Sequence, residues 1–210
     1  QKSFIKNPKH IFNFWINEKD STIIQHIFDL PHITLEGQAK CALGIVTGNN
    51  SKYCISHTKQ GYAPIYKGSD ISPKKLKEPK TYISQDFSNF QQVAPLSMYL
   101  APVKIIYRFI SSRLVFFCDT EQRFILNSSN LVIPNESIPI SCPQLSDLLN
   151  SDLMNWLFMS LFRTHKILRG DIELLPLHTN YFKKHKKFQE ESYLSFIGLI
   201  KENDGTYRKK

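Results

Sequence analysis

The chain has 210 residues, a formal net charge of +9, 41% hydrophobic and 12% aromatic residues. This length and apolar content are enough for one large domain with its own core, which excludes a mainly disordered chain. The excess of Lys and Arg favours a polyanionic partner. Because no apolar stretch has the form of a signal peptide or the length of a membrane span, we expect a cytoplasmic protein without membrane contact. Gln1 stands where a complete chain would begin with Met, which suggests a segment of a longer protein.

The four cysteines are Cys41, Cys54, Cys118 and Cys142. They are far apart and form none of the closely spaced pairs that zinc sites use. We therefore expect free thiols in a reducing compartment and no metal ligands in this chain.

Residues 1–38 are expected to form a helical lead-in or a linker. Ser21 or Asp20 can cap a short helix that ends before Pro31. One face of that helix would carry the apolar residues Ile23, Ile24, Ile27 and Phe28.

A strand at 39–46 and a returning strand at 53–55 are expected to form a hairpin. Between them lies Thr47-Gly48-Asn49-Asn50, and a Gly-Asn pair supplies the positive φ angles of a tight turn. Asn pairs well with adenine, so Thr47, Asn49 and Asn50 at the tip are candidates for base contacts, with Lys52 beside them.

Further short strands are expected at Tyr62–Tyr66, 81–84, 103–110, 114–118, 124–126 and 130–133. Pro73 and Pro79 break the lysine-rich segment 72–80 into a loop. From residue 146 the leucines recur at helical spacing and predict a helix over 146–161. Residues 178–210 are expected to form a basic helical tail that frays after residue 200.

The predicted fold class is α+β. A curved, mostly antiparallel sheet would form the core of residues 39–177, with one helix before it and helices after it.

Five motifs in order carry a family resemblance. They are Gly-Ile-Val-Thr-Gly-Asn-Asn at 44–50, Pro-Ile-Tyr-Lys-Gly-Ser-Asp-Ile at 64–71, the segment 90–111, the segment 114–134 ending in Leu-Val-Ile-Pro, and the pair 148–156 and 168–176. Together they make residues 42–176 resemble the C-terminal specificity domain of TaqI-like adenine DNA methyltransferases and their fused restriction enzymes.

This resemblance implies a domain that reads duplex DNA while another domain of the same parent chain performs adenine-N6 methylation. S-adenosylmethionine would bind that methyltransferase domain, as would Mg²⁺ if an endonuclease is fused. The family's methyltransferases hold the flipped adenine with an Asn-Pro-Pro-Tyr type motif, whereas here Asn7-Pro8 is followed by Lys9. We therefore expect this chain to be non-catalytic and to recognise DNA for a bacterial type II restriction–modification protein.

Basic residues carry the expectation of DNA contact. In an alternating strand, Lys104, Ile106 and Arg108 share a face, which we expect to meet solvent or phosphate. Arg suits bidentate contacts with guanine or phosphate, and Lys acts as a point charge. The other basic candidates are Lys67, Lys74, Lys75, Arg113, Arg163, Lys166 and Arg169.

Three alternatives remain. One is a general nucleic-acid-binding module that reads shape or single strands. The second is a protein-docking domain whose basic face meets an acidic partner. The third is a nuclease, since Asp70 and Glu78-Pro79-Lys80 imitate the Asp…Glu-x-Lys pattern of magnesium-dependent endonucleases, although Pro79 stands where a paired strand is needed.

Overall fold

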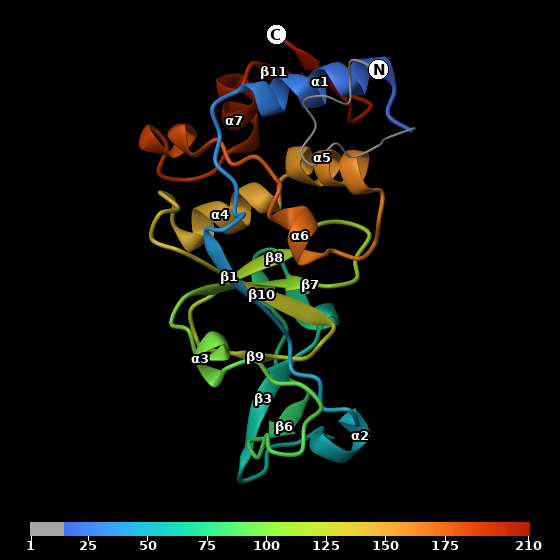
Figure 1. Ribbon diagram of the computed structural model, residues 1–210, viewed down its shortest axis with the longest axis vertical. Coiled ribbons are helices and arrows are strands. Elements are labelled where there is room, and N and C mark those ends of the chain that lie inside the picture. Colours follow the sequence, from blue (N-terminus) through green and yellow to red (C-terminus); the bar gives the residue numbers. More distant parts are fainter. Residues whose placement is uncertain (1–14) are drawn as a thin grey trace.

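The computed structural model describes residues 15–210, so residues 1–14 of the expected helical lead-in or linker lie outside the described residues. Two lobes flank a central four-stranded sheet (Figure 1): a helical lobe above it and a smaller β lobe below it. The described residues include no helix long and apolar enough to cross a membrane.

The central sheet is antiparallel throughout and has the strand order β1-β10-β7-β8. Its strands are β1 (Ala39–Leu43), β7 (Lys104–Arg108), β8 (Phe116–Asp119) and β10 (Ser129–Pro134). Ile105 and Tyr107 belong to the core of the helical lobe, whereas Ile106 belongs to the core of the β lobe. Both faces of the sheet are therefore buried, which explains the nearly unbroken apolar run in β7.

The β lobe holds a second sheet with the order β2-β6-β3-β9, in which β3 and β9 are parallel and the other pairs antiparallel. Its elements are α2 (Asn50–Tyr53), β2 (Cys54–Ile55), β3 (Tyr62–Tyr66), η3 (Gly68–Asp70), β4 (Ile71–Ser72), β5 (Lys75–Leu76), β6 (Tyr82–Ser84), α3 (Leu96–Tyr99) and β9 (Phe124–Ile125). The lysine-rich segment 72–80, expected to be a loop, thus contains the short β4–β5 hairpin.

The helical lobe is built from both ends of the described chain. Its elements are α1 (Glu18–Asp29), α4 (Cys142–Leu149), α5 (Asp152–Phe162), α6 (Arg169–Ile172), η4 (Thr179–Lys183), α7 (Glu190–Phe196), β11 (Leu199–Lys201) and β12 (Tyr207–Lys209). The α+β class with mostly antiparallel sheets, an N-terminal helix and C-terminal helices is therefore confirmed. The proposed division into segments 1–38, 39–177 and 178–210 stays a prediction, and one core contains Ile27, Ile105 and Tyr207 together.

Two helices occupy the region of the single helix expected over 146–161. The helix is interrupted at Ser151, because the Ser151 side chain caps the start of α5 by accepting a hydrogen bond from the Met154 amide. The Asn150 side chain bonds both the amide and the carbonyl of Phe116, which ties the break to the edge of β8. The helix α1 agrees with the expected one except that Asn17 caps it.

Two further expectations are wrong. Residues 199–209 form the β11–β12 hairpin and do not fray, and Tyr207 is completely buried beside Trp156. Cys118 and Cys142 form a disulfide between β8 and α4, so free thiols are confined to Cys41 and Cys54. Sequence separation gave no hint of this pair, because only the folded sheet brings the start of α4 to the end of β8.

His178 joins the two ends of the helical lobe. Its Nε2–H donates to the Ile27 carbonyl of α1 at 3.0 Å, so Nδ1 accepts from the Tyr193 hydroxyl of α7 at 2.7 Å. Burial lowers the pKa of His178 to about 4, against a weaker upward effect of the bond to Ile27.

Acidification is expected to destabilise the fold through His178. An unfolded His protonates near pH 6.5, whereas the folded ring stays neutral until about pH 4. The stability contribution is complete above the unfolded pKa and falls by about 3 kcal/mol as the pH drops towards 4. Urea unfolding at several pH values measures this loss. The loss of stability on acidification should be smaller in His178→Gln and unchanged in the control His57→Gln, since His57 is exposed. An equal loss in the wild type and both variants would mean that another group causes it.

Candidate nucleic-acid interface

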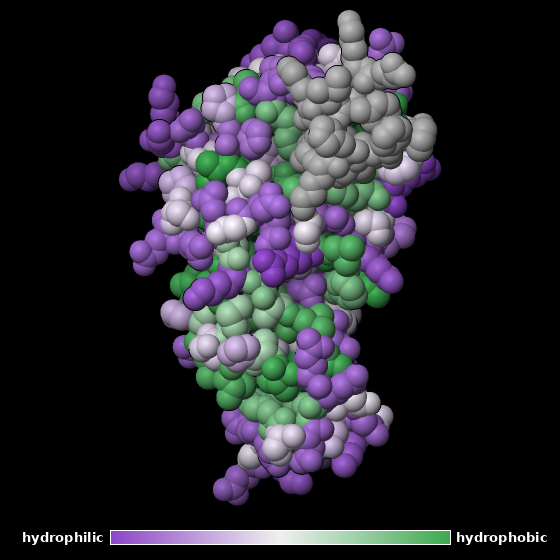
Figure 2. Space-filling model, in the orientation of Figure 1, coloured by the Kyte–Doolittle hydropathy of each residue, from purple (hydrophilic) through white to green (hydrophobic). Residues whose placement is uncertain are grey.

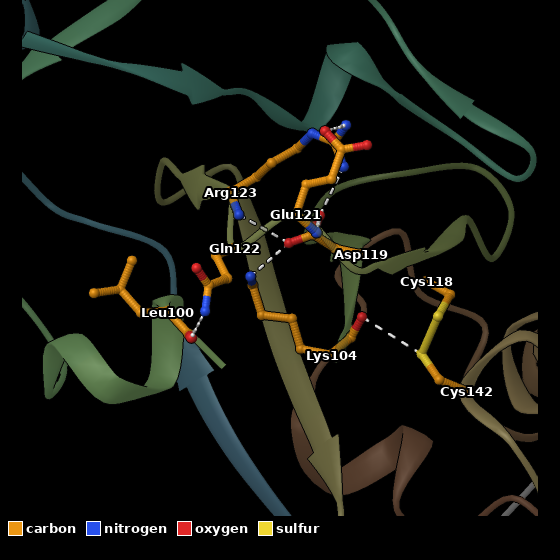
Figure 3. A network of polar contacts seen from close by, with 8 residues as sticks. All are labelled: Leu100, Lys104, Cys118, Asp119, Glu121, Gln122, Arg123 and Cys142. Carbon is orange, nitrogen blue, oxygen red and sulfur yellow. Dashed lines mark hydrogen bonds and ion pairs between the residues drawn. A yellow bond between two sulfur atoms is a disulfide. The ribbon is translucent and has the colours of Figure 1, made fainter. Parts of the chain in front are cut away.

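Lys104 lies inside the protein and not on a basic surface. Its Nζ donates to Asp119 Oδ2 at 2.5 Å across the β7–β8 pair, and both side chains are completely buried (Figure 3). Arg123 Nη1 donates to Asp119 Oδ1 at 2.8 Å and its other terminal nitrogen bonds Glu121. The expectation that Lys104 meets solvent or phosphate is therefore wrong.

Each partner of this pair offsets part of the cost of burying the other. Burial lowers the pKa of Lys104, an effect that Asp119 partly reverses. Burial alone would raise the pKa of Asp119, but the hydrogen bonds from Lys104 and from the amide and side chain of Arg123 hold it below its usual range. The Asp119 carboxylate thus stabilises the turn between β8 and β9, by accepting from the Glu121 and Arg123 amides, in addition to forming the ion pair.

Arg108, at the opposite end of β7, is also structural. Its Nε and Nη2 donate to the Ile71 carbonyl at 3.0 and 2.6 Å, and its side chain is half-buried. This bond holds β4 of the β lobe against the central sheet. The predicted basic face of β7 therefore bonds within the central sheet at Lys104 and bonds the β lobe at Arg108.

The predicted hairpin at 47–50 is wrong. β2 pairs with β6 and not with β1, and residues 50–53 form the single helical turn α2. Thr47 is only 3% exposed, and its hydroxyl donates to Asn50 Oδ1 at 2.7 Å. Asn49 caps α2 by accepting from the Lys52 amide at 3.1 Å. Thr47 thus orients a turn, while Asn49, Asn50 and Lys52 are exposed.

Hydrogen bonds to the side chain and the carbonyl of Ser128 bring together segments from distant parts of the sequence. The Gly68 amide donates to Ser128 Oγ at 2.9 Å, and the Phe109 amide donates to the Ser128 carbonyl at 3.0 Å. Residue 110 in turn pairs with residue 166 in an antiparallel bridge. We call the exposed members of this row the recognition flank; they are Lys67, Ile110, Asn127, Ser128 and Lys166.

Other predicted elements lie on the same side of the molecule. Helix α2, the loop after β7 and the segment between α5 and α6 all appear at the right of Figure 1. The flank thus combines parts of the helical lobe with parts of the β lobe, and the bond from Arg108 to the Ile71 carbonyl holds the β lobe against the central sheet.

The remaining candidates are exposed, and several have partners. Arg113 Nη2 lies 3.2 Å from Asp152 Oδ1, and Arg169 Nε lies 2.8 Å from Glu173 Oε1. The guanidinium of Arg163 lies over the Trp15 ring, with 5.8 Å between its carbon and the ring centroid. Lys74 and Lys75 stand on the β4–β5 hairpin. The pair of Arg113 and Asp152 is about half exposed and worth under about 1 kcal/mol, so it is easily exchanged for phosphate. Glu173 is only 8% exposed, so Arg169 balances the charge of a buried carboxylate.

Sequence reasoning missed Asp119 and Arg123 as partners of Lys104. A usable signal was present: Lys104 directly precedes two isoleucines, and Asp119 ends the next strand of the same hairpin. A lysine in a strand buried on both faces needs such a carboxylate. Ile110 was missed because an isoleucine at the end of an apolar strand normally belongs to a core.

The first carboxylate of the nuclease pattern has a structural role. Asp70 Oδ2 accepts the Lys67 amide at 2.9 Å and so caps η3. Within residues 15–210, no group of three or more His, Cys, Asp or Glu side chains could hold a metal ion.

Comparisons with known proteins give three results. Residues 63–177 match the family described as the TaqI-like C-terminal specificity domain. The type II methyltransferase M.VspI of Vibrio sp. (strain 343) is 54% identical over 74 residues, which are 35% of this chain and 18% of that protein. A chain from a solved structure of a type I R-M system aligns over 80% of this chain and 38% of its own length, with 17% identity and a TM-score of 0.43.

The family match covers more than half of the chain and spans the central sheet from β7 to β10, most of the β lobe, and helices α4 to α6. All five residues of the recognition flank lie within the matched segment. The chain belongs to the family of TaqI-like C-terminal specificity domains.

Proposed function

We propose that this chain reads the target sequence of duplex DNA for a bacterial type II restriction–modification adenine-N6 methyltransferase. The observation that carries the proposal is the recognition flank, on which Lys67 and Lys166 are exposed beside the polar side chains of Asn127 and Ser128. Lysines position phosphates, and amide and hydroxyl groups contact base edges. Membership of the specificity-domain family supports the same assignment.

In this proposal, DNA lies between the flank and a methyltransferase domain of the same parent chain. Lys52, Lys67, Lys166 and the cations of Arg113, Arg163 and Arg169 fix the phosphate register, while Asn49 and Asn50 are candidates for base contacts. The lysines of the β4–β5 hairpin extend the phosphate contacts. The target adenine is flipped into the other domain, which also binds S-adenosylmethionine.

The chain itself is proposed to be non-catalytic and cytoplasmic, and any Mg²⁺-dependent cleavage would belong to another part of the parent. An exposed apolar surface around α3 fits a protein neighbour such as the methyltransferase domain. Leu96, Leu100 and Val103 are each more than 40% exposed. Figure 2 shows hydrophobic surface over the lower half of the molecule, where Figure 1 places α3.

The direct test is selection from random duplex DNA with the 210-residue chain at low salt, followed by a salt titration of the selected sequences. An enriched short motif containing adenine is the expected result. Salt-sensitive binding without enrichment would favour a general nucleic-acid-binding module. A lack of binding at low salt would contradict DNA recognition by this chain and favour protein docking.

Charge removal on the flank is expected to flatten the salt dependence. Lys67→Gln and Lys166→Gln should each reduce the slope of log K against log salt by about 0.9, because each releases one fewer counterion. Lys209→Gln, on the exposed terminal strand β12, is the matched control and should leave the slope unchanged. Equal slopes in the wild type and all three variants would show that neither Lys67 nor Lys166 contacts DNA phosphate.

A further inference from the structure

The segments around residues 110 and 166 form a short exposed ribbon, defined here as residues 109–111 and 165–167. The Ile167 amide donates to the Phe109 carbonyl at 2.8 Å, and the Ser111 amide donates to the His165 carbonyl at 2.9 Å. Ile110 and Lys166 face each other between these two bonds. In such a pair the two side chains lie on the same face and are close neighbours.

The ribbon has an inner and an outer face. Ile167 is 1% exposed and belongs to the core of the helical lobe, so it anchors the inner face. Side chains alternate along an extended chain, which places Lys166 and Leu168 on the outer face with Ile110. Leu168 is in an extended conformation and is 46% exposed.

Ile110 is 64% exposed, more than any other large hydrophobic residue in the described part of the chain. Residues 108–113 and 163–169 contain five Lys or Arg residues and no Asp or Glu. The five are Arg108, Arg113, Arg163, Lys166 and Arg169. Arg108, Arg113 and Arg169 already bond the Ile71 carbonyl, Asp152 and Glu173, so Lys166 is the cation placed directly beside Ile110 whose charge is complementary to phosphate. Ile110 and Leu168 together form an exposed apolar surface beside it, which is typical of an interaction site.

We propose that Ile110 is a specificity-determining residue that contacts the 5-methyl group of a thymine in the major groove while Lys166 contacts the adjacent phosphate. This inference rests on the proposed function. Of the base edges in the major groove, the thymine methyl group is the apolar one, so it is the chemical partner that isoleucine fits. The backbone bonds of the ribbon and the bond from Phe109 to Ser128 fix Ile110 beside the polar residues of the flank.

The test is a double-mutant cycle between protein and DNA. Wild-type protein and Ile110→Ala are titrated with the motif selected by the wild type and with copies in which each thymine is replaced in turn by deoxyuridine, which lacks the methyl group. We expect one replacement to weaken wild-type binding about fourfold, the effect of one buried methyl group at about 0.8 kcal/mol. The same replacement should not affect Ile110→Ala.

Ile110→Ala should also reduce the ratio of motif binding to random-sequence binding, without changing the salt slope. Val103→Ala removes a comparably exposed side chain at the other end of β7 and should change neither quantity. Thermal unfolding should be nearly unchanged in both variants, since both side chains are exposed.

The two proposals fail in different ways. If the wild type selects a motif but all thymine replacements are without effect, or if Ile110→Ala remains sensitive to them, the contact of Ile110 is refuted and DNA recognition stands. If the wild type binds DNA without selecting a motif, a base contact by Ile110 is refuted along with sequence reading. Absence of any binding refutes the proposed function itself.

Discussion

Replacing Lys104 with Met is expected to lower the free energy of unfolding by about 3 kcal/mol at pH 7. The substitution leaves the Asp119 carboxylate in a site without solvent access and removes its 2.5 Å partner. Removing one member of a buried pair typically costs about 3 to 5 kcal/mol. The lower value applies because Arg123 still bonds the other oxygen of Asp119.

The control and the rescue variant separate charge from packing. Lys40→Met makes the same change at an exposed position of β1 in the same sheet and should alter stability by less than about 0.5 kcal/mol. In Lys104→Met/Asp119→Asn the buried charge is removed. The amide oxygen can take the place of Oδ1, which accepts from the Glu121 amide and the Arg123 side chain, while the Arg123 amide loses its acceptor Oδ2. We expect this double variant to be more stable than Lys104→Met, as measured by urea unfolding. A double variant that is less stable would show that the carboxylate is not the source of the loss.

The pH dependence gives a second readout. In the wild type the pKa of Asp119 is depressed, so its contribution is complete above the unfolded pKa of about 3.9 and is lost as the pH falls through the folded value. Without Lys104, the desolvated carboxyl accepts a proton more readily. The difference in stability between Lys104→Met and the wild type should therefore be smaller near pH 4 than at pH 7.

Local patterns predicted the elements of this fold well. The strand Tyr62–Tyr66 and the apolar face of α1 follow from periodicities of 2 and 3.6 residues, which depend only on neighbouring positions. The partners with which the strands pair could not be predicted from these local patterns. The turn at Gly48 has the expected positive φ angle, yet it leads into α2 and not into a hairpin, because β2 pairs with β6 about thirty residues later.

The candidate site was only partly predictable for the same reason. Alternation along β7 correctly placed Lys104 and Arg108 on one face, but the nature of that face depends on whether a second lobe covers it. The β lobe does cover it, so these cations bond Asp119 and the Ile71 carbonyl. Lys67 and Lys166 are brought into one row by contacts through Ser128, which no spacing rule encodes.

Gly44→Ala is expected to prevent stable folding, with a loss of more than about 4 kcal/mol. The Cβ of an alanine here would lie 2.2 Å from the Leu126 carbonyl oxygen and 2.7 Å from that of Ser129. These are backbone atoms, and the Gly44 amide itself donates to the Ser129 carbonyl at 3.0 Å. The clash cannot be relieved by turning a side chain, so β10 and the segment 126–129 would have to move away from β1.

The matched control is Gly170→Ala. A Cβ at Gly170 would meet nothing within 4 Å, and this glycine lies in α6, where alanine is favoured by about 1 kcal/mol. Circular dichroism and urea unfolding should show a native or slightly stabilised Gly170→Ala and a Gly44→Ala without a cooperative transition. Gly44 joins β1 to the turn that carries Asn49 and Asn50. Ser129 directly follows the flank residues Asn127 and Ser128.

The close approach of Gly44 to Ser129 therefore sets the spacing between two parts of the proposed interface. A cooperative, near-native Gly44→Ala would mean that the two segments are free to separate, and the row of contacts through Ser128 would then not be fixed by the fold.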